Sequence, residues 1–285
     1  MASTREIKRR IRGINSILQI TKAMEMVSTA KLRRARIRLA KTRPYFQTVV
    51  DDIQGILSIM GEDHPLLAKR EKETILYIVL TSDKGLAGGY NANVLRLTES
   101  AIKDDGCRSK LLVVGNKAKD YFERRNYDIV KSYTGLSEDP SYSHAQDLAA
   151  VAMELYENKE VDAIRIVYTK FISTISYQAG MTSILPSEDL KAKDDAPAPR
   201  TQIEFEPSPQ SVLDYLIPMY VETAIFGALI EAAASEQGSR RVSMENASDN
   251  AHDMIDELQT NYNRARQAAI TNEITEIVSA ADAVQ

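Results

Sequence analysis

Apolar residues recur with a period of 3.5 through the first sixty positions of this 285-residue chain. Alternating steps of four and three residues, from Ile7 to Met60, reach sixteen positions, of which twelve are apolar. This spacing is typical of a coiled-coil seam. A helix of this length extends roughly 80 Å at 1.5 Å per residue and cannot bury its own apolar stripe. The pattern therefore predicts a long helix that needs a partner.

The seam contains a polar interruption and, further on, a proline. Three of its polar members are Thr21, Glu25 and Ser28, and each has an apolar neighbour one position earlier, namely Ile20, Met24 and Val27. We therefore expect a local register shift that unwinds the supercoil here. Pro44 disfavours a regular helix, but the apolar pattern continues past it. We expect a bend or local irregularity there, after which the helix resumes.

The end of the chain supplies a candidate partner helix. From Pro209 onward apolar residues again recur at helical spacing, and many are alanines that allow another helix to approach closely. This second stripe consists of Leu213, Leu216, Tyr220, Ala224, Met244, Ala251, Ile255, Leu258, Tyr262, Ala265, Ala269, Ile274, Ile277, Ala281 and Val284. The simplest architecture is an antiparallel coiled coil of the first and last helices.

Charge is distributed unevenly along the chain, whose overall net charge is −4. Residues 1–43 carry a net charge of +11, and residues 201–285 carry −10. The two ends could attract each other, the basic end could meet an acidic partner, or both could be solvated helix faces. The stretch from Ile277 to Gln285 has only Asp282 as a charged side chain. This tip is either a frayed end or a segment seated in an apolar socket.

The middle of the chain alternates between strand and helix patterns. Strands are predicted at Thr74–Thr81, Leu111–Gly115 and Ala163–Tyr168, and a strand or bent strand pair at Ile172–Leu185. Helices are predicted near Asn91–Lys103, Lys117–Arg125 and His144–Asn158. The alternation indicates a partly parallel, Rossmann-like sheet. The expected α/β organisation is thus a coiled-coil helix at 1–60, an inserted Rossmann-like domain at 74–185, a proline-rich linker at 186–209 and a second coiled-coil helix at 210–285.

The residues offer little for catalysis or metal binding. The single cysteine, Cys107, excludes an internal disulfide, and the three histidines show no metal-ligand spacing. The segment from Ser82 to Tyr90 lies between a strand and a helix, where a phosphate-binding loop would occur, but Ala87 and Tyr90 stand where the dinucleotide motif requires glycine. A tight turn or a partner-contacting loop is favoured, and a Rossmann-like nucleotide-binding enzyme remains an alternative.

Nucleic-acid binding is a second alternative, because the first helix is strongly basic. Its lysines and arginines scatter around the helix, however, and leave Leu32, Ala35 and Leu39 as a seam. Base-stacking aromatic residues are also lacking before Tyr45 and Phe46. A protein partner is therefore favoured. No signal peptide or apolar run of membrane-spanning length is evident, so we expect a soluble chain that could still belong to a membrane complex.

Three segments resemble the gamma subunit of the F-type ATP synthases. They are Ile20–Ser28 (ITKAMEMVS) with Lys31 and Leu32, Thr81–Asn91 (TSDKGLAGGYN), and Tyr262–Val278 (YNRARQAAITNEITEIV), of which the last is the most specific. The resemblance extends over effectively the whole chain.

The resemblance implies a non-catalytic central-stalk rotor that couples ion flow to ATP synthesis. Its coiled coil would turn inside a ring of three alpha and three beta subunits, and its α/β domain would meet the epsilon subunit and the membrane c-ring. The chain would have no cofactor, small-molecule substrate or nucleic-acid partner of its own, since Mg-ATP and ADP bind the alpha and beta subunits. It would be a peripheral protein on the cytoplasmic side of the cell membrane.

The resemblance also assigns roles to particular residues. Arg266 and Gln267 fall on the family's contact with the beta catch loop, and the Arg266 guanidinium could make a forked pair with carboxylates. Lys22 and Met24 fall on a second torque-sensitive patch. The uncharged tail, from Ile277 to Val284 and beyond, would be a bearing at the top of the ring.

Overall fold

The computed structural model describes residues 4–60, 73–187 and 208–282, together with residues 66, 67, 70, 190 and 206. Two long helices, α1 (Thr4–Met60) and α5 (Pro209–Asp282), enclose the other elements in sequence. Helix α1 passes Pro44 without interruption, so the helix continues as the apolar pattern predicts, and the irregularity expected at the proline does not break it. Of the sequence-predicted linker, 186–209, most lies outside the described residues.

The chain divides into two compact units. One consists of residues 1–28 and 241–285, and the other of residues 29–240. Each long helix contributes to both units, and each unit is described below by itself.

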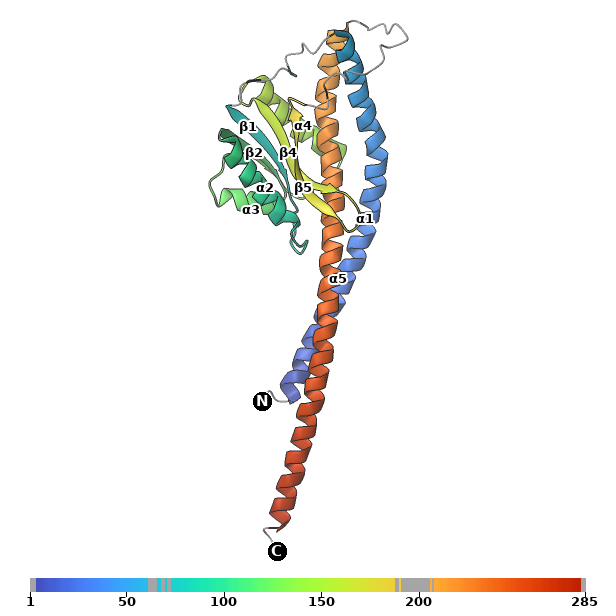
Figure 1. Ribbon diagram of the computed structural model, residues 1–285, viewed down its shortest axis with the longest axis vertical. Coiled ribbons are helices and arrows are strands. Elements are labelled where there is room, and N and C mark those ends of the chain that lie inside the picture. Colours follow the sequence, from blue (N-terminus) through green and yellow to red (C-terminus); the bar gives the residue numbers. More distant parts are fainter. Residues whose placement is uncertain are drawn as a thin grey trace. The chain divides into compact units, whose positions relative to one another are not determined.

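The larger unit is built on a five-stranded sheet of order β3-β2-β1-β4-β5 (Figure 1). Its strands are β1 (Thr74–Leu80), β2 (Arg108–Val114), β3 (Ile129–Tyr133), β4 (Ala163–Phe171) and β5 (Tyr177–Leu185). The first four strands are parallel, and β5 pairs antiparallel with β4. The partly parallel α/β sheet is therefore confirmed.

Side chains alternate across the sheet and divide the core between its two faces. On β1, Leu76, Ile78 and Leu80 point to the core that contains α4 (Tyr142–Glu157), the second half of α1 and the start of α5. The intervening β1 residues point to the core beneath α2 (Tyr90–Asp105) and α3 (Asn116–Glu123). Because both faces are covered, β1 is a nearly continuous apolar run.

One strand is absent from the sequence prediction. β3 lies at the edge of the sheet, and its five residues, IVKSY, are all half-buried or exposed. An edge strand with one open side does not need the apolar run that identifies a central strand. The region 172–185, predicted as a strand or bent pair, contains a tight turn followed by the single strand β5.

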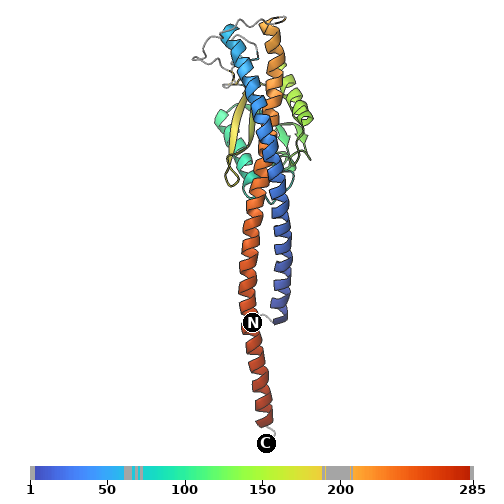
Figure 2. The same ribbon diagram turned by 90° about the vertical axis from the view of Figure 1, so that its right-hand side faces the viewer.

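In the smaller unit the beginning of α1 and the second half of α5 run antiparallel, side by side (Figures 1 and 2). The predicted register shift near residue 21 is wrong. Thr21 and Ser28 stay buried, at 8% and 2% exposure, whereas Ile20 and Val27 are 59% and 55% exposed. Small hydroxyl side chains fill the seam where the helices approach closely, and the apolar residues beside them face outward.

The seam predicted from the 3.5-residue period otherwise matches the burial pattern. Every predicted seam position from Ile7 to Ile56 is buried or half-buried in its own unit. Part of α5 passes a length-and-composition test for a membrane-spanning helix, but more than half of that window is buried within the protein. A core helix of a globular protein shows the same properties.

Candidate partner interface

The segment after β1 turns its polar groups toward the rest of its own unit. We call residues 81–90 the clamp loop. The Ser82 backbone N–H donates to Asn91 Oδ1 at 2.9 Å, and the Asp83 carboxylate accepts from Asn116 N at 3.2 Å and from Ser137 Oγ at 3.0 Å. The loop is thereby fixed to α2, to α3 and to the segment before α4.

The clamp loop also binds α5 through backbone carbonyls. Arg240 donates to the carbonyl oxygens of Lys84 and Gly85 at 3.4 and 3.2 Å, and Ser239 Oγ donates to Ala87 O at 2.7 Å. At the end of the loop, Tyr90 Oη donates to Ala232 O at 3.2 Å. A phosphate site presents N–H donors to its ligand, whereas this loop presents acceptors to an arginine. The loop therefore attaches the α/β domain to α5.

Arg240 is anchored by a buried ion pair. Its Nη1 lies 2.8 Å from Glu236 Oε1, one turn earlier on α5, and the two side chains are only 6% and 0% exposed. Burial raises the pKa of the Glu236 carboxyl, and the Arg240 guanidinium opposes this shift. A buried charge is costly unless it is paired and hydrogen-bonded, and Arg240 meets that condition through Glu236 and the loop carbonyls.

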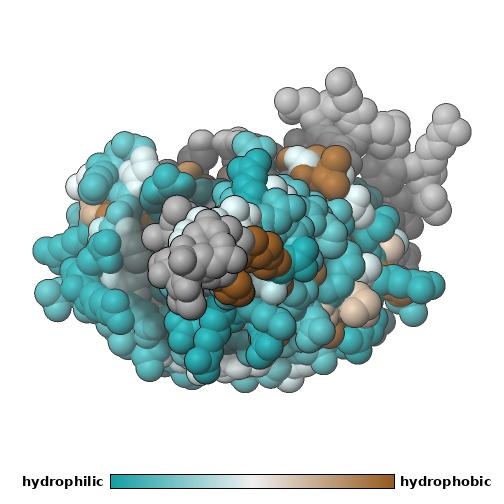
Figure 3. All heavy atoms as spheres, turned by 90° about the horizontal axis from the view of Figure 1, so that it is seen from below, coloured by the Kyte–Doolittle hydropathy of each residue, from teal (hydrophilic) through white to brown (hydrophobic). Residues whose placement is uncertain are grey.

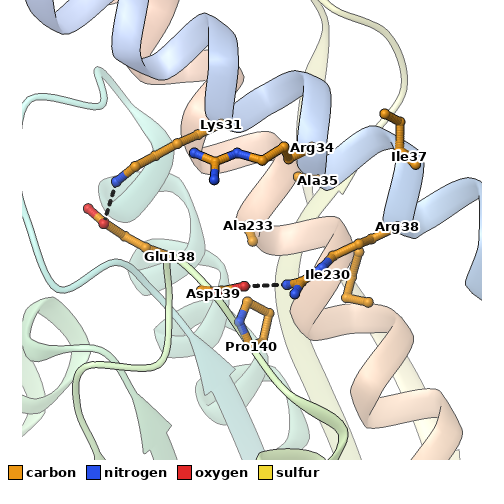
Figure 4. Close-up of a pocket in the computed structure, with 10 residues that line it drawn as sticks. All are labelled: Lys31, Arg34, Ala35, Ile37, Arg38, Glu138, Asp139, Pro140, Ile230 and Ala233. Carbon is orange, nitrogen blue, oxygen red and sulfur yellow. Dashed lines mark hydrogen bonds and ion pairs between the residues drawn. The ribbon is translucent and has the colours of Figure 1, made fainter.

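A basic pocket of about 360 Å³ lies beside this clamp, between α1, α5 and the segment before α4 (Figure 4). Lys31 Nζ is 2.5 Å from Glu138 Oε2, and Arg38 pairs with Asp139. The bond from Lys31 holds the pKa of the Glu138 carboxyl below its usual range. Arg34, also lining the pocket, makes no ion pair in the part of the chain that the structure describes.

The pocket lining has an excess of positive charge and a partly apolar wall. Its three cations face two carboxylates, and Ala35, Ile37, Pro140, Ile230 and Ala233 complete the lining. A carboxylate on a short aliphatic stem matches this chemistry, because Arg34 could bind it in a forked geometry.

The smaller unit carries two separate surface patches. Lys22 is exposed and pairs with Glu25 at 3.0 Å, which raises the pKa of the Lys22 amine. Met24 is half-buried two residues further along the helix. Ile17, Ile20 and Val27 on the same helix are exposed. Arg266 and Gln267 are exposed on α5. Since Thr21 contacts Ser248, Arg266 lies about 27 Å further along α5 at 1.5 Å per residue, and the structure does not bring the two patches together.

Helix α5 continues beyond its last contact with α1. Ala265 is half-buried, and every residue from Arg266 to Ile277 is exposed. Ile270, Ile274 and Ile277 follow one another at helical spacing, with Ile277 70% exposed. Figure 3 views the protein from this end and shows apolar atoms beside the end of the helix among hydrophilic ones. Val284, predicted as part of the bearing, lies outside the described residues.

Comparison with known proteins decides the family. A family model described as ATP synthase matches residues 3–284. The ATP synthase gamma chain of Alkaliphilus metalliredigens is 49% identical over 284 residues, which is 98% of each chain. The sodium-ion-specific gamma chain of Acetobacterium woodii is 42% identical over 99% of each chain. This chain belongs to the ATP synthase gamma chain family.

Solved structures agree with this assignment at the level of the fold. A chain of the Euglena gracilis mitochondrial ATP synthase matches with a TM-score of 0.72 at 22% identity, covering 99% of this chain and 94% of that chain. A chain from the central stalk and c-ring of the Tetrahymena thermophila enzyme matches with a TM-score of 0.60 at 25% identity, covering 80% and 99%.

Membership in the gamma chain family makes this protein the rotor subunit of an ATP synthase and not a catalytic subunit. The nucleotide-binding enzyme and the nucleic-acid-binding protein are not favoured. Sequence reasoning missed the residues that attach the domain to α5, above all Arg240 and Glu236. The only local signal for them is the spacing of Glu236 and Arg240, which stand four residues apart and can therefore pair along one helix face.

Proposed function

We propose that this gamma chain transmits torque through its paired terminal helices, which turn inside a ring of three alpha and three beta subunits. In this proposal the α/β domain connects α5 to an epsilon subunit and a membrane c-ring. The complex would lie on the cytoplasmic side of the cell membrane, with Mg-ATP and ADP bound by alpha and beta. Support comes from the bacterial relatives, whose names identify them as ATP synthase gamma chains.

The observation that carries the proposal is the bare end of α5. An exposed helix with isoleucines at 270, 274 and 277 has no covering partner among the described residues of its own chain. Burial of apolar area contributes about 25 cal/mol per Å², so such a stripe favours a surrounding protein. A socket formed by the ring would act as a bearing for Ile277 and the tail to Val284.

The rotor must present a different face to each partner around it. One side of the smaller unit shows Ile17, Ile20 and Val27, and other faces of α1 are basic. Each orientation of such an asymmetric shaft would favour a different conformation of the beta subunit that it touches, which is a population shift driven by rotation. Lys22 and Met24 would lie at one of these contacts.

Charged contacts would add specificity. Arg266, with Gln267 beside it, would pair with carboxylates of a beta loop, since its guanidinium is exposed and has no ion-pair partner in the described chain. The basic pocket at Arg34 would receive an acidic side chain of a partner subunit.

Arg266→Ala tests this assignment against Arg264→Ala as a matched control. Both arginines are exposed, and their two-residue separation places them on nearly opposite sides of the helix. We expect Arg266→Ala to weaken complex assembly by about tenfold in affinity or to reduce ATP synthesis, while the melting curve of the isolated chain stays unchanged. The control, Arg264→Ala, should leave assembly, ATP synthesis and the melting curve unchanged. Normal assembly and synthesis in Arg266→Ala would refute the role of this residue.

A further inference from the structure

A second cavity, of about 300 Å³, opens between α1, α5 and the β4–β5 pair of the larger unit. It is separate from the basic pocket in Figure 4, with which it shares no lining residue. Its volume is at the lower end of the range for small-molecule sites. The lining is formed by Leu39, Thr42, Arg43, Phe46, Ile166, Tyr168, Lys170, Thr182, Ile184, Tyr220, Ala224, Gly227, Ala228 and Glu231.

The inner wall of this cavity is apolar and buried. Leu39, Ile166, Ile184 and Tyr220 are each less than 9% exposed, and they come from all three sides of the cavity. On α5 the wall contains Gly227, where an added Cβ would meet nothing within 4 Å. The absence of a side chain there leaves open space in the cavity.

Two of the three charged side chains that line the cavity are exposed, unlike its buried apolar wall. Arg43 and Lys170 are exposed, and neither forms an ion pair in the described part of the chain. The third charged group, Glu231, already accepts from Tyr168 Oη at 3.0 Å and from Phe171 N at 3.1 Å. Burial raises the pKa of the Tyr168 hydroxyl, so this hydrogen bond persists at neutral pH. The lining therefore carries a net positive charge, supplied by exposed side chains.

We propose that this cavity binds a small amphiphilic monocarboxylate. Its apolar body would lie against Leu39, Ile184 and Gly227, and its carboxylate would stay near the surface between Arg43 and Lys170. An uncharged amphiphile would leave the two cations unmatched. A cationic one would meet like charge at the entrance, and a nucleotide would bring too much polar surface to the apolar wall.

Charge specificity can be measured on the full chain with three probes that share an unbranched ten-carbon chain, the carboxyl carbon of the first included. Isothermal titration at neutral pH, below the micelle concentration, would compare decanoate, decan-1-ol and decyltrimethylammonium. We expect one decanoate per chain and weaker binding of the other two. Bound decanoate should also raise the melting temperature, because a ligand that binds only the folded state stabilises it.

Variants would locate the site. Arg43→Gln with Lys170→Gln should weaken decanoate binding about tenfold, as expected for the loss of two surface ion pairs, and leave decanol unchanged. Gly227→Leu should abolish binding by filling the open space. The matched controls are Arg33→Gln with Lys103→Gln, and Gly13→Leu, whose added Cβ also meets nothing within 4 Å. Both controls should bind normally.

Several results would overturn the proposal. Absence of decanoate binding to the unmodified chain removes it outright. Equal affinity for decanol and decanoate contradicts the ionic contact, and unchanged binding in the Arg43/Lys170 double variant does the same. Because those two side chains are on the surface, this variant is expected to fold even if Gly227→Leu does not. None of these results bears on the rotor function, because the cavity proposal does not depend on that function.

Discussion

Ser248 Oγ of α5 lies 2.8 Å from Thr21 Oγ1 of α1, and both side chains are buried in the helix seam. Each hydroxyl also contacts a backbone carbonyl of its own helix. Thr21 Oγ1 lies 3.1 Å from Leu18 O, and Ser248 Oγ lies 2.9 Å from Met244 O. Polar groups buried in this way cost little, because each has a hydrogen-bond partner. The seam can therefore keep its 3.5-residue period through a polar stretch.

The register of this seam predicts opposite outcomes at adjacent positions. Thr21→Lys forces a charge into the buried seam and should lower the free energy of unfolding by about 2 kcal/mol. Ile20→Lys places the same charge on the exposed face and should change that free energy by less than about 0.5 kcal/mol. Urea unfolding followed by circular dichroism measures both. Equal losses in the two variants would contradict the register.

The clamp between the α/β domain and α5 should depend on Arg240 and not on its neighbour. Arg240→Ala leaves Glu236 buried without its cation, which costs about 3–5 kcal/mol in folding stability. Arg241→Ala removes a pair with Glu245 at 2.9 Å that is partly exposed, and should cost about 0.5 kcal/mol. Urea unfolding compares the two arginines. Replacing both buried partners, as Glu236→Gln with Arg240→Met, should restore most of the lost folding stability. Similar costs for Arg240→Ala and Arg241→Ala would show that the clamp is unimportant.

The stability of the chain should carry a pH dependence from Glu236. Burial raises the pKa of its carboxyl above the reference value of 4.5, so at a pH between 4.5 and the raised value the folded chain binds more protons than the unfolded chain. Stability therefore falls as pH rises through that window. The unfolding free energy of the unmodified chain minus that of Glu236→Gln should be larger near pH 5 than near pH 7. A smaller difference near pH 5 would mean that the Arg240 charge lowers the pKa of the Glu236 carboxyl more than burial raises it.

Two glycines of α5 should respond differently to alanine. Gly227 has open space for a Cβ, and Gly227→Ala should raise the free energy of unfolding by about 0.5–1 kcal/mol through helix propensity. At Gly238 a Cβ would lie 2.5 Å from Tyr177 Oη, so Tyr177 must move. We expect Gly238→Ala to be less stable than Gly227→Ala by about 1 kcal/mol or more in thermal unfolding. Equal gains would show that Tyr177 moves at no cost.

Elements with a strong local pattern could be predicted from the sequence. The long helices, the central strands β1, β2 and β4, and the seam positions follow from periodicity and apolar runs. β3 could not be predicted, because an edge strand lacks the apolar run. The register at Thr21 could not be predicted either, because periodicity does not reveal hydrogen bonds between helices. The contacts of Arg240 join residues about 155 positions apart, a separation at which local patterns carry no information.

The paired ends of the chain are tested most directly by joining them covalently inside the complete ATP synthase. Thr21→Cys and Ser248→Cys, in a Cys107→Ser background, place two thiols where the hydroxyl oxygens are 2.8 Å apart, close enough for a disulfide. Rotation and ATP synthesis would be measured before and after oxidation, with the disulfide confirmed by mass spectrometry. If both helices turn as one shaft, the disulfide forms and both activities are unchanged. Failure of the disulfide to form, or a loss of rotation that reduction reverses, would contradict the account.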